Sequence, residues 1–242
     1  MNAAMLLAAA AVSFGLASAY EGYGTYYGGI GGQWGPGTCH QTFIYDGFWG
    51  IALNEAQYGD MGSGHYCGAC VAGTIKQQDG STKDFKGVID NACGTCGYND
   101  LDFGIDGDGR YDITWDFISC PEHDLMLSVE VGNPYYGLIS VQGGGPVDGV
   151  DVNGAPATQQ DGLWAIHSDA GQLGCGPEVR VRLRDGRDVT RCMSPGDFGG
   201  DCLNDGPRCS GGDRRRALWP TGGYHHETAA ADAAAAAAAL VA

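Results

Sequence analysis

The stretch that decides the fold runs from Val88 to Cys120 and reads VIDNACGTCGYNDLDFGIDGDGRYDITWDFISC. It places one acidic residue, Asp102, between the apolar residues Leu101 and Phe103, shortly after a CxxC loop. A carboxyl group among apolar side chains keeps its proton to a higher pH, because a low dielectric disfavours the charged form. Such a group can act as an acid catalyst or as a hydrogen-bond partner. A second carboxylate beside Asp102 would favour an enzyme, and its absence would favour a binding protein.

Outward from this stretch, the chain opens with MNAAMLLAAAAVSFGLASAY, an apolar run that closes on Ala17, Ser18 and Ala19. This pattern predicts a secretory signal peptide cleaved before Tyr20, although no Lys or Arg precedes the apolar run. An N-terminal anchor helix is the alternative, but the run is short for a membrane span. The other end, ETAAADAAAAAAALVA, is of low complexity and predicts a disordered tail rather than a lipid-anchor signal.

Ten cysteines all lie after the expected cleavage site. An even number of cysteines in a secreted chain indicates disulfides. Zinc is the competing interpretation, because Cys67-x-x-Cys70 and Cys93-x-x-Cys96 have the spacing of two zinc knuckles. The oxidising compartment favours disulfides, so we expect neither a metal nor a cofactor. The cysteines are Cys39, Cys67, Cys70, Cys93, Cys96, Cys120, Cys175, Cys192, Cys202 and Cys209.

The formal net charge of the chain is −16. An acidic surface repels nucleic acid, anionic membranes and acidic polymers, and therefore suits a neutral polysaccharide best. We expect no nucleic-acid partner, no membrane contact once the leader is removed, and a monomer. Near the N-terminus, aromatic residues spaced by glycines are candidates to line a groove for a flat ligand. They are Tyr23, Tyr26, Tyr27 and Trp34.

Short apolar runs separated by Gly and Asp predict a mainly β fold, and VRVRLRDGRDVTRC has the pattern of a hairpin. The length suits two small domains. The cysteines fall into a group of six and a group of four, and the domain boundary is expected near Gly132. We therefore expect four segments: a signal peptide (1–19), a first domain (20–131), a second domain (132–220) packed against the first, and a disordered tail (221–242).

Several motifs occur in an order that resembles expansins and their microbial relatives. They are Gly24-Thr25-Tyr26-Tyr27-Gly28, Cys67-Gly68-Ala69-Cys70, Val88-x-Asp90, Cys93-x-x-Cys96, Leu101-Asp102-Phe103, Ile113-x-Trp115 and Cys120-Pro121. Residues 133–209 resemble the second expansin domain more weakly. The resemblance implies a six-stranded double-psi β-barrel followed by an immunoglobulin-like β-sandwich that binds cellulose. It also implies the disulfides Cys39–Cys67, Cys70–Cys120 and Cys93–Cys96, and leaves the four later cysteines unassigned.

The same resemblance implies roles for particular residues. Asp102 matches the acidic residue essential to expansins and the catalytic acid of the related family-45 endoglucanases. Thr25 and Asp90 match polar groups beside it in the groove, and Tyr26 matches an aromatic residue of the groove wall. Ala92 stands where the family usually has another aromatic residue. In the second domain the expected aromatic platform is Tyr135, Tyr136 and Trp164.

Hydrolysis with inversion needs a second carboxylate about 6.5–9.5 Å from the acid. The positions that match this base are Gly28 and Gly29, which have no side chain, and Asp90 is the remaining candidate to face the groove. We therefore expect a secreted, extracellular protein that binds a cell-wall glucan and loosens noncovalent contacts without hydrolysis. The alternative is a glycan-cleaving enzyme, an endoglucanase or a lytic transglycosylase, that uses Asp102 as its acid. A wall-structural protein in which Asp102 is inert is the third possibility.

Overall fold

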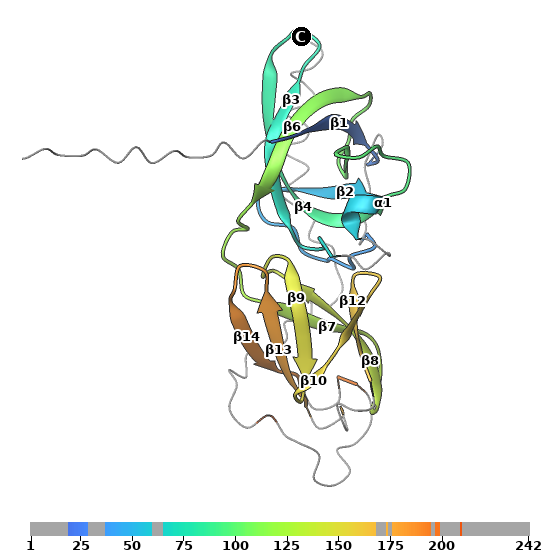
Figure 1. The fold of residues 1–242 in the computed structure, drawn as a ribbon, viewed down its shortest axis with the longest axis vertical. Helices are drawn as coiled ribbons and strands as arrows, with labels where there is room; N and C mark the ends of the chain where they lie inside the picture. The colour runs from blue at the N-terminus through green and yellow to red at the C-terminus, as the bar shows by residue number, and fades with distance from the viewer. Residues whose placement is uncertain are drawn as a thin grey trace, which may run out of the picture.

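The computed structural model describes residues 19–28, 37–59, 65–167, 173, 176–194, 197–198 and 209. Figure 1 shows two β-rich units, one above the other. The described residues include one α-helix, α1 (Glu55–Tyr58), and no helix among them is long and apolar enough to span a membrane. The expected leader up to residue 18, the Ala-rich tail, Gly29, Trp34, Cys175 and Cys202 lie outside the described residues.

The first unit is a closed barrel of six strands in the order β1-β5-β2-β4-β3-β6. Strands β1 and β5 pair in parallel, as do β2 and β4, and the other neighbours are antiparallel. The fold expected for the first domain is thereby confirmed. The strands are β1 (Tyr20–Tyr26), β2 (Trp49–Asn54), β3 (Cys70–Lys76), β4 (Thr82–Cys93), β5 (Leu101–Phe103) and β6 (Tyr111–Ile118).

Large apolar side chains fill the barrel interior. Leu53, Leu101 and Phe103 are fully buried, and Trp115 is almost so. Gly24 on β1 makes room for this core, since a Cβ atom there would lie 2.6 Å from the Phe103 ring. Alternate residues of a strand point to opposite faces, so these inward-facing residues determine which of their neighbours face outward.

The three disulfides expected for the barrel are confirmed: Cys39–Cys67, Cys70–Cys120 and Cys93–Cys96. The cysteines of the first CxxC motif thus bond to distant partners, and the four-cysteine zinc arrangement does not form. In the second unit Cys192 pairs with Cys209.

The second unit is a sandwich of two four-stranded sheets, β10-β9-β13-β14 and β11-β12-β8-β7. Its apolar core lies between them and includes Ile139, Val150, Val181 and Phe198. The predicted hairpin is present as β13 and β14. The strands are β7 (Met126–Asn133), β8 (Tyr136–Gln142), β9 (Val147–Val152), β10 (Ala155–Pro156), β11 (Thr158–Gln160), β12 (Leu163–Ile166), β13 (Glu178–Leu183) and β14 (Asp188–Cys192).

The expected domain boundary at Gly132 needs correction, because Gly132 lies within β7, a strand of the sandwich. The change of domain falls between the end of β6 at Ile118 and the start of β7 at Met126. The grouping of the cysteines does not locate the boundary, because no cysteine lies between Cys120 and the next group. Residues 126–133 form the first strand of the second unit, so this unit begins before Gly132.

The two units pack against each other, as the short connection predicted. Gln142, at the end of β8, is buried and reaches the barrel loop that precedes β2. Its side chain accepts a hydrogen bond from the Thr42 amide (2.8 Å) and donates one to the His40 carbonyl (3.1 Å). The Tyr45 hydroxyl donates to the Gly143 carbonyl at 3.0 Å. These polar contacts, which are made by the buried side chains of Gln142 and Tyr45, hold the barrel and the sandwich in one arrangement.

Candidate functional site

Asp102 lies at the middle of β5, the shortest strand of the barrel, between β1 and β2. Its neighbours Leu101 and Phe103 are fully buried in the barrel core, so the Asp102 side chain points away from that core. The register pairs Asp102 with Thr25 on β1 and with Ala52 on β2. The apolar residues on either side, which marked Asp102 in the sequence, are therefore what direct it outward.

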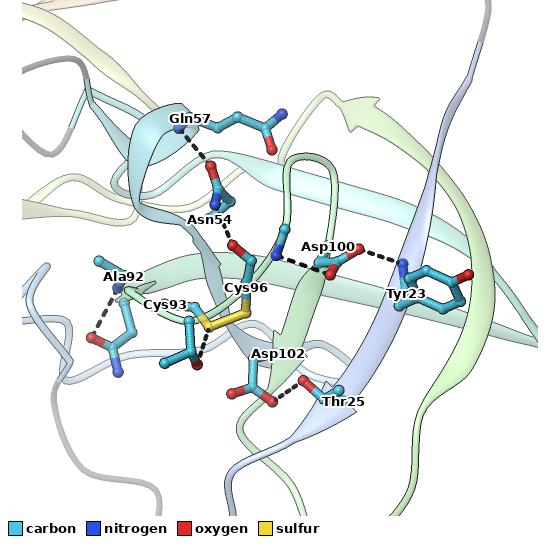
Figure 2. The surroundings of a disulfide bond; sticks show 12 residues. Tyr23, Thr25, Asn54, Gln57, Ala92, Cys93, Cys96, Asp100 and Asp102 are labelled. Atoms are coloured by element: carbon cyan, nitrogen blue, oxygen red, sulfur yellow. Dashed lines mark hydrogen bonds between the residues drawn. A yellow bond between two sulfur atoms is a disulfide. The ribbon is translucent and has the colours of Figure 1, made fainter.

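Thr25 holds the Asp102 carboxylate in place. The Thr25 hydroxyl donates a hydrogen bond to Asp102 Oδ1 at 2.7 Å (Figure 2). Partial burial raises the pKa of Asp102 above its ordinary value, and the hydrogen bond from Thr25 opposes that rise. Asp102 thus keeps a proton to a higher pH than an exposed aspartate, as its sequence context predicted.

The Cys93–Cys96 disulfide lies directly beside this carboxylate (Figure 2). Both sulfur atoms and a carboxylate oxygen of Asp102 lie within 4.8 Å of one another. Asn54, at the end of β2, fixes the disulfide loop by donating from Nδ2 to the Cys96 carbonyl at 2.6 Å. The loop thus contributes to the surroundings of Asp102.

Asp100 fixes the other side of the same loop. Its Oδ2 atom accepts from the Gly97 amide at 3.0 Å, and its Oδ1 atom accepts from the Tyr23 amide at 2.8 Å. Asp100 therefore links the disulfide loop to β1 (Figure 2). Sequence reasoning singled out neither Asp100 nor Asn54. The position of Asn54 directly before Glu55 is the helix-capping signal that could have indicated it.

The aromatic residues of β1 and Tyr27, which directly follows it, divide between the two faces of this segment. Thr25 faces outward, so alternation places Tyr23 and Tyr27 on its face and Tyr26 on the opposite one. Tyr23 and Tyr27 are 42% and 36% exposed. Tyr26 is half-buried and packs against the Phe103 ring at 5.5 Å between centroids. The resemblance assigned the groove wall to Tyr26, whereas the aromatic residues on the face of Asp102 are Tyr23 and Tyr27.

Asp90 does not face an open groove. Its exposed fraction is 0%, so its side chain cannot touch a ligand in this conformation. The pairing of β2 with β4 shifts register here, because Ile51 pairs with Ile89 and Ala52 with Asn91. Asp90 is the extra residue of this β-bulge, and a bulge redirects a side chain in a way that regular alternation does not predict.

Gly28 lies so close to the backbone of Ile105 that no side chain fits. A Cβ atom at Gly28 would lie 2.5 Å from the carbonyl carbon and oxygen of Ile105. The position that matches the catalytic base is therefore closed to any side chain unless the backbone moves. Gly29 lies outside the described residues.

The three aromatic residues expected to form a platform on the sandwich are not equivalent. Tyr135 is 61% exposed in the turn between β7 and β8, and Tyr136 is partly exposed at the start of β8. Trp164 is only 6% exposed, because it pairs with Ile139 on the face of β12 that packs into the sandwich core. Trp164 is thus a core residue and is unavailable for stacking on a ligand.

The closed six-stranded barrel, the packed β-sandwich and the outward-facing acid on β5 define a two-domain protein with the expansin fold. Among solved structures, the chain is similar to an expansin of Clavibacter michiganensis. The TM-score is 0.57 to a point mutant in complex with cellohexaose, at 19% sequence identity over 73% of this chain and 93% of that one. For the apo protein the TM-score is 0.57 and the identity 20%, with the same coverage. No protein-family model matches the chain. No curated protein matches it in sequence.

Proposed function

We propose that this protein binds a neutral cell-wall glucan of the cellulose type and loosens noncovalent contacts between polysaccharide chains without hydrolysing them. We also propose that it is extracellular, with residues 1–19 as the leader. The observation that carries the non-hydrolytic part is the close contact of Gly28 with the backbone of Ile105. Asp102 has no carboxylate partner at the position where the related hydrolases have their base.

The face around Asp102 suits a sugar chain. The Thr25–Asp102 pair offers hydrogen bonds, and alternation along the chain places Tyr23 and Tyr27 on the same side, with the Arg110 guanidinium 3.8 Å from the centroid of the Tyr23 ring. Aromatic rings stack on the apolar faces of pyranose rings, while a hydroxyl and a carboxylate bind the sugar hydroxyls. The net charge of −16 disfavours acidic polymers and leaves neutral glucans as the best match.

The sandwich supplies a second contact region. Tyr135 and Tyr136 lie at the β7–β8 turn. Trp164 does not extend this pair, because its side chain is buried. Because the barrel and the sandwich are joined by the Gln142 contacts, both regions can engage one polymer without a flexible tether. The neighbouring expansin structure that contains cellohexaose supports this choice of ligand.

The test combines binding and cleavage on one sample. We expect the wild-type protein to bind insoluble cellulose in a pull-down without generating reducing ends. Asp102→Asn keeps the shape of the site and should lose the loosening of cellulose fibres, whereas Asp46→Asn, an exposed carboxylate in the loop before β2, should behave as wild type. New reducing ends from the wild type, or unchanged loosening by Asp102→Asn, would contradict the proposal.

One observation favours the glycan-cleaving alternative. Burial raises the pKa of Asp102, and a carboxyl group that stays protonated can donate to a leaving oxygen. A lytic transglycosylase needs only this one acid, because a hydroxyl of the sugar acts as the nucleophile. Products from such a reaction are anhydro-sugars without a new reducing end, so mass spectrometry of the soluble fraction distinguishes this activity from hydrolysis and from simple binding.

A further inference from the structure

The disulfide beside Asp102 brings together three groups that bind metal ions. Cys93 ends β4, Cys96 lies in the loop that follows, and Asp102 lies on β5. Their sulfur and oxygen atoms lie within 4.8 Å of one another. Figure 2 shows Asp102 next to the disulfide, with its carboxylate hydrogen-bonded to Thr25. In the oxidised protein the two sulfurs are bonded to each other and are poor ligands.

We propose that reduction of the Cys93–Cys96 disulfide converts this corner of the barrel into a zinc site with Cys93, Cys96 and Asp102 as its protein ligands. The second part of the proposal, which rests on the proposed function, is that zinc bound there withdraws Asp102 from glucan and switches glucan binding off. The oxidised protein is then the active form.

The geometry suits zinc. Zn–S bonds of about 2.3 Å and Zn–O bonds of about 2.0–2.2 Å in a tetrahedron place ligand atoms ~3.5–4 Å apart. The three donor atoms lie within 4.8 Å of one another, so they reach this spacing if the two bonded sulfurs separate after reduction and the carboxylate shifts slightly toward them. Two thiolates favour Zn²⁺ over Mg²⁺ or Ca²⁺, because those ions prefer oxygen ligands. Water takes the fourth position, since Cys96 and Asp102 are partly exposed.

Outer groups orient these ligands, as is usual around metal sites. The Thr25 hydroxyl donates to Asp102 Oδ1, which leaves Oδ2 for the metal. The Thr95 hydroxyl lies 3.8 Å from Cys93 Sγ, within hydrogen-bond reach of a sulfur. Asn54 holds the carbonyl of Cys96. The supporting contacts are therefore present before any metal binds.

The reduction step needs a small-molecule thiol, which supplies both electrons. Its thiolate attacks Sγ of Cys96, the more exposed residue of the pair, and Cys93 leaves as a thiolate that takes up a proton. A second thiol resolves the mixed disulfide, which yields one external disulfide and two protein thiols. Zinc then replaces the proton of each thiol, and both protons pass to water.

This disulfide is the one that should be reduced first in the barrel. It joins residues separated by 3 positions, against 28 and 50 for the other two barrel disulfides. The stabilisation that a disulfide gains from loop closure grows with loop length, so the shortest loop gains least. One cysteine of each bridge is buried, and Cys93 is 8% exposed against 2% for Cys39 and 1% for Cys70.

The test of the metal site uses Co²⁺ as a spectroscopic probe for zinc. The full chain is treated with limiting phosphine reductant, desalted without oxygen, and mapped by alkylation and mass spectrometry. We expect the reduced protein to bind one Co²⁺ ion and to show a thiolate-to-cobalt charge-transfer band with the intensity of two thiolate ligands. Added zinc should displace the Co²⁺ and remove the band. Asp102→Asn should weaken zinc affinity by at least about tenfold, the lower end of the loss seen for outer-shell partners. Asp46→Asn is the matched carboxylate control.

Two further variants assign the thiolates. Cys93→Ser/Cys96→Ser should abolish the band, whereas Cys192→Ser/Cys209→Ser, which removes the described bridge of the sandwich, should leave it intact. Equal zinc affinity in wild type and Asp102→Asn, or an unchanged band in the Cys93→Ser/Cys96→Ser variant, would refute the site. So would equal binding by the oxidised protein.

A separate cellulose pull-down tests the switch. Reduced wild type should lose at least about tenfold in cellulose affinity when zinc is added, and a chelator should restore it. Unchanged cellulose binding by the zinc-loaded protein would refute the switch and leave the metal site standing. Failure of the oxidised, metal-free protein to bind cellulose would refute the proposed function itself, and the Co²⁺ result does not depend on it.

Discussion

At the scale of single residues, the environment of Asp102 makes a prediction about stability and pH. The folded protein raises the pKa of Asp102 through partial burial, so the charged form is disfavoured in the folded state. The contribution of Asp102 to stability is therefore greatest below the unfolded pKa, about 3.9, and is lost as the pH rises through the folded pKa.

The expected outcome is that Asp102→Asn is slightly more stable than wild type at neutral pH, because the amide avoids the cost of a buried charge while still accepting from Thr25. Asp102 is partly exposed, so we expect a gain of less than about 1 kcal/mol after solvent screening. The difference should vanish as the pH falls below about 3.9. Urea unfolding of both proteins from pH 3 to pH 8 measures it, and a difference that grows toward low pH would contradict the assigned direction of the shift.

Gly28 supports a second prediction at this scale. Gly28→Ala should destabilise the barrel by about 1–3 kcal/mol, because the added methyl group meets the Ile105 backbone and forces the segments that follow β1 and β5 to shift. Gly28→Asp should be worse, and should not yield a hydrolase. Gly94→Ala is the control, since the nearest atom to a Cβ there is Glu55 Oε2 at 3.4 Å. Chemical denaturation gives the free energies, and a Gly28→Ala barrel as stable as Gly94→Ala would show that this position accepts a side chain.

At the scale of elements, Asn54 connects the end of β2, the start of α1 and the disulfide loop. Its Oδ1 atom accepts from the Ala56 and Gln57 amides as a helix cap, and its Nδ2 atom donates to the Cys96 carbonyl. Asn54→Ala loses both functions, each worth about 1 kcal/mol, so we expect a loss of about 2 kcal/mol. Asn54→Ser retains a capping oxygen and should lose about half of that.

Hydrogen exchange separates these two contributions. Both Asn54 variants should exchange the amides of the 93–100 loop faster than wild type, whereas only Asn54→Ala should speed exchange at the Ala56 and Gln57 amides. Unchanged protection of the loop in both variants would mean that Asn54 does not hold it.

The elements also show where sequence reasoning succeeded and where it stopped. Asp102 was predictable because Leu101 and Phe103 flank it with apolar side chains on the opposite face of a strand. The same alternation assigns Tyr23 and Tyr27, rather than Tyr26, to the face of Asp102. Asp90 was not predictable, since a β-bulge interrupts the alternation of β4. The prediction that Trp164 contacts a ligand was wrong. All four residues of β12 are buried, so the sequence of this strand has no polar face that would indicate its orientation.

At the scale of the whole molecule, the order of motifs predicted both domains, but the sequence did not indicate how they join. The apolar pattern of residues 126–133 would suit a strand of either domain. Only the pairing of β7 with β8 assigns this strand to the sandwich. The contact through Gln142 involves residues about 100 positions apart, which no local pattern reveals. That contact makes the arrangement of the two ligand-facing regions a property of the whole chain.

The consequence is a prediction about cooperativity. Gln142→Ala leaves the Thr42 amide and the His40 carbonyl without their partner in a partly buried interface, at a cost of about 1–3 kcal/mol. We expect wild type to unfold in one calorimetric transition and Gln142→Ala in two, with the barrel and the sandwich melting separately. Gln160→Ala, which changes an exposed glutamine on β11 of the same sheet, should preserve the single transition.

The same contact should matter for binding. Two contact regions that are held together bind a polymer with an avidity that uncoupled regions lack, so Gln142→Ala should lower the affinity for cellulose while a short cello-oligosaccharide binds as before. A single transition in Gln142→Ala with an unchanged midpoint would mean that other contacts hold the domains together, and equal losses for polymer and oligosaccharide would place the defect within one domain.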